Sequence, residues 1–145
     1  MSIKNIFRVP HQSTPASVAL LFLRLFMGAA FLYHEYGKML APFHWIPAEA
    51  SIHIPPFFQF LAAISEFCGG IALILGVIVP LASFGMASTM LVASFTHAMI
   101  YKDPFVNLNG GSSFESPMSY LFISIVFFAV GPGKYSLDKL IFGEK

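Results

Sequence analysis

The sequence predicts an all-α fold: a bundle of four transmembrane helices in one domain. Hydrophobic residues make up 57% of its 145 residues and charged residues only 10%, whereas about 25% of residues are charged in soluble domains. The apolar residues gather in four stretches, and each approaches the length of about 20 residues that a helix needs to cross the hydrocarbon core. Prolines and polar loops separate these stretches. We therefore expect an integral membrane protein whose principal partner is the lipid bilayer.

Proline and glycine mark the ends of the expected spans, which cover residues 17–40, 57–79, 81–101 and 114–130. Pro15 suits the first turn of the first helix, and Pro42 ends that helix. Pro80 leaves a very short, uncharged turn, so the second and third helices should form an antiparallel hairpin. The fourth stretch begins near Pro117, is short for a span and stops at Gly131.

Basic residues gather at the two ends of the chain. The lead, residues 1–16, holds Lys4 and Arg8, and the tail, residues 132–145, holds three lysines. Cytoplasmic segments of membrane proteins carry an excess of Lys and Arg. We therefore expect the membrane domain, residues 17–131, to cross a bacterial inner membrane several times, with both termini cytoplasmic and the polar tail in water. Four spans agree with this orientation.

Charge and cysteine content exclude several classes of function. The formal net charge is +1, so there is no basic surface that would bind nucleic acid. The single cysteine, Cys68, excludes an internal disulfide and a two-thiol redox centre within one chain. Any chemistry therefore has to come from other side chains.

The stretch from Leu23 to Leu40, LRLFMGAAFLYHEYGKML, is unusual for a membrane helix because it holds Arg24, His34, Glu35 and Lys38. An ionisable group near the centre of such a helix costs about 2.5–3.5 kcal/mol on insertion scales, so it is kept where it finds a partner or water. Because successive helical residues turn by about 100°, Arg24 and Glu35 return to nearly the same face. This stripe of the helix should therefore face the bundle.

Ionisable residues of the other stretches should meet this stripe in the outer half of the bundle. A rise of about 1.5 Å per residue places His97 level with His34, Glu66 beneath them and Glu115 on the same side. Arg24 lies deeper, but its long side chain should reach toward Glu66. We interpret the set as a polar pocket. The candidate catalytic residues are His34, Glu66 and His97, and the candidate ligand-binding residues are Arg24, Glu35, Lys38 and Glu115.

Each of these residues also has a structural interpretation. In this alternative, Arg24 and Glu66 form a buried ion pair that fixes helix packing, and His97 is a hydrogen-bonded core residue. Lys38 extends its ammonium group to the membrane interface. A metal site built from His34, His97 and a glutamate would have allowed ligand types, but the spacing shows no local ligand motif, so no metal is expected.

Three stretches together resemble the DoxX family of small membrane proteins: LRLFMGAAFLYHEYGKML, EFCGGIALILGVIVPLAS and GPGKYSLD. The resemblance covers residues 17–138. It departs from the family pattern at Glu35, where the family usually has Gly, and in the Pro-rich first loop. The resemblance implies a four-helix membrane bundle, and by matching position it implies a pocket formed by Arg24, His34, Lys38, Glu66 and His97. Glu35 and Glu115 are added from geometry alone.

Some members of this family are linked to thiosulfate:quinone oxidoreduction, so the resemblance implies a quinone-linked redox subunit, an oxidoreductase component of the inner membrane. The sequence has no haem, flavin or iron–sulfur motif. We therefore expect no intrinsic cofactor besides a quinone, with electrons supplied by a redox partner protein or by the substrate. The alternatives are a binding or transport module for a small molecule or lipid, and a structural partner of another membrane protein. Assembly as a homo-oligomer is left open.

Overall fold

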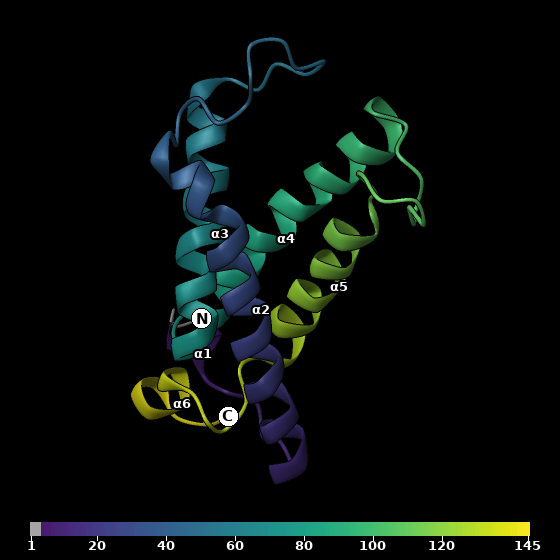
Figure 1. Ribbon diagram of the computed structural model, residues 1–145. Helices are drawn as coiled ribbons and strands as arrows, with labels where there is room; N and C mark the ends of the chain where they lie inside the picture. Colours follow the sequence, from purple (N-terminus) through teal and green to yellow (C-terminus); the bar gives the residue numbers. More distant parts are fainter. Residues whose placement is uncertain (1–3) are drawn as a thin grey trace.

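The computed structural model describes residues 4–145, so the first three residues of the expected lead lie outside the described residues. The described chain is all-α and contains no strand, as the sequence predicts. Figure 1 shows α2 beside α3 and α4 beside α5, with both termini at one end and the two long loops at the other. The helices, in chain order, are α1 (Lys4–Phe7), α2 (Thr14–Leu40), α3 (Pro56–Leu75), α4 (Val79–Phe95), the π-helix η1 (Thr96–Ile100), α5 (Glu115–Val130) and α6 (Leu137–Phe142).

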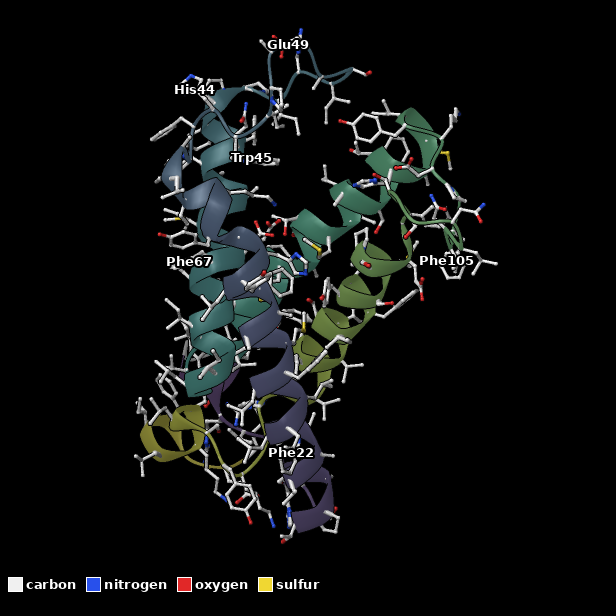
Figure 2. All side chains as sticks on the ribbon, viewed as in Figure 1. Phe22, His44, Trp45, Glu49, Phe67 and Phe105 are labelled. Atoms are coloured by element: carbon white, nitrogen blue, oxygen red, sulfur yellow. The ribbon has the colours of Figure 1, made fainter. Side chains whose placement is uncertain are left out.

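Among residues 4–145, three helical segments are long and apolar enough to cross a membrane: Thr14–Leu40, Pro56–Leu75 and Val79–Ile100. The fourth apolar helix, α5, has 16 residues and is shorter. Large apolar side chains cover the outer faces of these helices: Phe26 and Phe22, for example, are 69% and 66% exposed, and Figure 2 labels Phe22 on the lower part of α2. Soluble monomers rarely expose contiguous apolar patches larger than a few hundred Å². The chain is therefore a multi-pass membrane protein, and the crossing by α5 stays a prediction.

Glycine lets α2 and α3 pack with their backbones nearly in contact. A Cβ atom placed on Gly28 would lie 2.6 Å from the carbonyl oxygen of Gly70, and a Cβ atom on Gly70 would lie 3.0 Å from that of Gly28. Such small residues are the usual means of close helix approach in membranes. A core of larger side chains, including Met27, Phe31 and Met86, fills the space between the two helix pairs.

Local capping sets where α2 and α3 begin and end. Ser13 caps α2 by accepting a hydrogen bond from the Ala16 amide at 3.3 Å, so α2 begins three residues before the predicted start. Gly76 ends α3 in a left-handed conformation with φ of 68°. The predicted second span, residues 57–79, therefore runs past the end of α3.

The tail does not simply lie in water, which corrects the expectation from its polar composition. Asp138 is fully buried, and its carboxylate accepts hydrogen bonds from the Ile78 amide at 2.6 Å and the Val79 amide at 2.9 Å. These two amides belong to the first turn of α4, where helical N–H groups have no partner within the helix. The tail therefore caps α4 from a distant part of the sequence.

Candidate functional site

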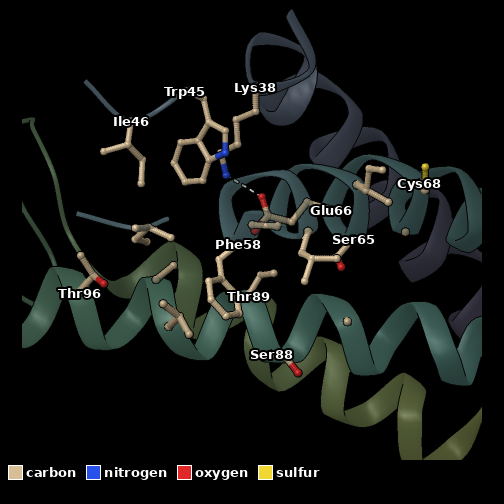
Figure 3. A pocket seen from close by; sticks show the side chains of 18 of the residues that line it. Lys38, Trp45, Ile46, Phe58, Ser65, Glu66, Cys68, Ser88, Thr89 and Thr96 are labelled. Atoms are coloured by element: carbon tan, nitrogen blue, oxygen red, sulfur yellow. Dashed lines mark hydrogen bonds and ion pairs between the residues drawn. The ribbon is translucent and has the colours of Figure 1, made fainter. Parts of the chain in front are cut away.

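A cavity of about 890 Å³ lies between α3 and α4, on the side of the bundle that carries the loops. Most of its lining is apolar and comes from facing positions of the two helices, such as Phe58 and Leu61 on α3 and Val92 on α4. The segment 45–54 contributes Trp45 and Ile46 to the lining, as Figure 3 shows. Ligand sites in proteins are typically mostly apolar cavities of this size with a few polar groups.

The charged side chains Lys38 and Glu66 line the cavity and form an ion cluster with Glu35, which lies behind them. The Lys38 ammonium lies 2.7 Å from a Glu35 carboxylate oxygen and 2.6 Å from a Glu66 carboxylate oxygen. Figure 3 shows the contact between Lys38 and Glu66 across the gap between α2 and α3. Glu35 and Lys38 stand one turn apart on α2, so both point to the same side.

Burial makes this ion cluster energetically important. The side chains of Glu66 and Glu35 are only 3% and 7% exposed, and that of Lys38 is 24% exposed. Buried carboxylates need an opposite charge because the surroundings cannot solvate them. The cluster carries one uncompensated negative charge when both carboxylates are ionised, so it has the capacity to take up a proton or a cationic group.

Trp45 and Gln59 hold the loop against the cavity. The Lys38 ammonium lies 4.4 Å from the centre of the Trp45 ring, a cation–π contact. The indole N–H of Trp45 donates to the Gln59 carbonyl at 2.9 Å. The Gln59 side chain accepts from the Ile46 amide at 3.1 Å and donates to the Ile54 carbonyl at 2.8 Å. One buried side chain therefore fastens both ends of the segment 46–54.

His97 lines the cavity from the π-helix η1. Its ring nitrogen Nδ1 lies 2.7 Å from a carboxylate oxygen of Asp103, and its ring is 5.5 Å from that of Tyr101. Lys102 adopts a left-handed conformation with φ of 58°, which turns the chain back so that Asp103 returns to His97. Single turns of π-helix occur frequently at functional sites.

Arg24 does not reach Glu66, so the predicted ion pair between them is wrong. Its fully buried guanidinium donates to the Leu73 carbonyl at 2.9 Å and to the Tyr135 carbonyl. Both acceptors lie at the end of the bundle that holds the tail. The partner of Glu66 is Lys38, whose ammonium lies 2.6 Å from the Glu66 carboxylate.

Two other predicted pocket residues lie outside this cavity. His34 is exposed on α2, with its ring against that of Tyr33, and Glu115 is exposed at the start of α5. The structure thus gathers Glu35, Lys38 and Glu66 in one cluster and places His97 on the lining of the same cavity. Within residues 4–145, no three His, Cys, Asp or Glu side chains form a group that could hold a metal ion.

Sequence reasoning missed Trp45, Gln59 and Asp103 as parts of the site. Gln59 precedes Glu66 by seven residues, so its place on the same face of α3 was visible, but not its bonds to the loop. Asp103 follows His97 by six residues, a spacing that no regular helix brings into contact. Only the combination of a π-turn and a left-handed residue creates that contact.

The family model described as DoxX matches residues 19–99 of the chain. The matched range runs from the first turns of α2 to the π-helix, so it includes the ion cluster and His97. No match is found among curated proteins or among solved structures.

Proposed function

The chain belongs to the DoxX family, and from this premise we propose that it is the quinone-binding subunit of a membrane redox system. One observation carries the proposal: a large, mainly apolar cavity lies between α3 and α4 and has a small number of polar groups on its wall. A quinone combines an apolar tail with two carbonyl oxygens that accept hydrogen bonds. The cavity offers an apolar wall for the first and donors for the second.

The polar groups that could hydrogen-bond a quinone or its quinol lie on opposite walls of the cavity. The Lys38 ammonium comes from α2, and the His97 ring and the Tyr101 hydroxyl come from η1 and the residue after it. In our proposal, the quinone ring lies between these walls and its tail follows the apolar groove toward Leu81 and Ala82 on α4. A polar head held in an apolar, largely formed cavity is the general pattern of cofactor sites.

Reduction of a quinone to a quinol takes up two electrons and two protons. The ion cluster suits the proton part, because it holds two carboxylates for one ammonium and because Glu66 lines the cavity, where a protonated carboxyl group could act as a proton donor. We propose that the electrons come from a redox partner protein or from a reduced substrate that docks at the loop side of the bundle.

Trp45 is the single tryptophan of the chain and lines the cavity, so its fluorescence should report binding directly. We propose titrating a short-chain benzoquinone into the purified protein and two matched variants. Ala93→Phe places a large ring on the cavity wall, whereas Ala129→Phe makes the same change on an exposed face of α5.

Quenching should saturate in the wild type and in Ala129→Phe, and the affinity of Ala93→Phe should fall at least tenfold. Equal affinities in all three proteins would contradict binding in this cavity. Mass spectrometry of molecules retained after gentle purification gives an independent check: a co-purified quinone is expected. A retained phospholipid without quinone would instead support a lipid-binding module.

A further inference from the structure

We infer that Asp103 is a positioning residue that fixes the tautomer of His97, so that the site prefers the quinol form of its ligand. The inference rests on the proposed function and deepens it, since it concerns which redox form the cavity binds. The evidence is the contact of 2.7 Å between the Asp103 carboxylate and His97 Nδ1, on the wall of the cavity.

An ionised aspartate only accepts hydrogen bonds, so its contact requires the proton of a neutral imidazole to be on Nδ1. The nitrogen left for a ligand is then Nε2, which carries a lone pair and accepts a hydrogen bond. A quinol hydroxyl donates such a bond. A quinone carbonyl is itself an acceptor, so its lone pair would face the lone pair of His97 Nε2 and no hydrogen bond would form.

Backbone hydrogen bonds hold His97 and Asp103 next to each other. The Asp103 amide donates to the His97 carbonyl at 2.9 Å, and the Tyr101 amide closes the π-turn on the Thr96 carbonyl at 3.0 Å. The side chains of His97 and Asp103 are 32% and 20% exposed. Their mutual orientation therefore depends on short local bonds of η1 and the residues after it.

The remaining polar groups of the cavity do not compete for the Asp103 carboxylate. Lys38 is engaged by Glu35 and Glu66 on the other wall, and Tyr101 meets the His97 ring through an edge contact of the aromatic rings. Asp103 therefore acts on the ligand through one atom, the Nε2 nitrogen of His97.

The test compares the affinities of a short-chain benzoquinone and its quinol, the latter kept reduced under argon, by Trp45 fluorescence. It is run at pH 8.5, well above the ordinary pKa of a histidine side chain, about 6.5. In the wild type we expect the quinol to bind about fivefold more tightly than the quinone, the effect of one net hydrogen bond. Asp103→Glu should keep this preference, because glutamate also only accepts.

Asp103→Asn should reduce the preference to less than about twofold, because an amide both donates and accepts and so no longer fixes the tautomer. Glu49→Gln removes a carboxylate from the exposed loop instead and should leave the preference unchanged. Equal binding of both forms by the wild type, or an unchanged preference in Asp103→Asn, overturns the inference while leaving the proposed function intact. Binding of neither form overturns both.

A second measurement needs no variant of Asp103. The ¹⁵N chemical shifts of histidine-labelled protein distinguish the two neutral tautomers, and His97→Gln assigns the signal. We expect the proton on Nδ1 at pH 8.5. A proton on Nε2 in the wild type would overturn the inference even if Asp103→Asn failed to fold.

Discussion

The cap that Asp138 provides for α4 yields a sharp stability prediction. Asp138→Ala removes the acceptor of the Ile78 and Val79 amides, and a buried amide left without a partner costs about 1–3 kcal/mol. Because the Ile78 contact is only partly buried, we expect a total loss of about 2–4 kcal/mol in the free energy of unfolding. Asp138→Asn keeps one acceptor oxygen and should lose about half as much.

The pH dependence of this effect follows from burial. Burial raises the pKa of the Asp138 carboxyl above its ordinary value, although the Val79 and Ile78 amides and the Arg24 charge oppose the shift. A carboxyl group whose pKa is raised by folding makes its full contribution to the stability of the folded state at pH values below its pKa in the unfolded chain. This contribution is lost as the pH rises through its pKa in the folded protein. The stability advantage of the wild type over Asp138→Asn should therefore be largest in acid and shrink toward neutral pH.

The assay is unfolding by SDS in mixed micelles, followed by far-UV circular dichroism at several pH values. All other titrating groups are common to the wild type and Asp138→Asn, so they cancel in the difference. A loss below about 0.5 kcal/mol for Asp138→Ala, the size of an ordinary surface effect, would refute the capping argument. A wild-type advantage that grows from acid to neutral pH would refute the argument from burial.

Three further predictions concern packing, charge and orientation. In the same SDS unfolding assay, Gly28→Ala should destabilise the protein by about 1–3 kcal/mol because the added Cβ meets the α3 backbone. The same change at Gly37, where a Cβ meets nothing within 4 Å, should be neutral or slightly stabilising. Lys38→Met should cost about 3–5 kcal/mol by leaving buried carboxylates without a cation, and adding Glu66→Gln should recover part of that loss in a double-mutant cycle; strictly additive losses would mean that the 2.6 Å contact contributes nothing. Reporter fusions at Asn109 should be external and those at the C-terminus cytoplasmic, and a periplasmic C-terminus would contradict the orientation.

Hydropathy predicted the helices well because a helix that crosses a membrane needs a long run of apolar residues, which is easily recognised in the sequence. The starts and ends of α2, and of α4 taken together with η1, lie within three residues of the predicted spans. The end of α3 was harder to predict from the sequence, since it depends on Gly76 adopting a left-handed conformation. Pro80 is the more conspicuous signal in the sequence, but it lies in the first turn of α4, a position that proline tolerates well.

The charge partners were harder to predict than the helices. Arg24 and Glu66 were paired because both were expected on bundle-facing stripes, but Glu66 pairs with Lys38 near the end of the same first helix, and Arg24 donates to Leu73 and to the tail. The tail supplies the Tyr135 carbonyl to Arg24, and the loop supplies the Trp45 ring to Lys38. Sequence periodicity describes the faces of a helix, whereas these contacts depend on how irregular segments fold back onto them.

The distance in sequence between α4 and its cap bears on the order in which the protein is made. Asp138 follows Ile78 by 60 residues and Val79 by 59, so the hairpin of α3 and α4 leaves the ribosome well before its cap exists. During that interval the backbone N–H groups in the first turn of α4 have to hydrogen-bond to water or to the insertion machinery. The Arg24 bond to Tyr135 and the Asp138 cap of α4 can form only once the tail has emerged, so both are late steps of biogenesis.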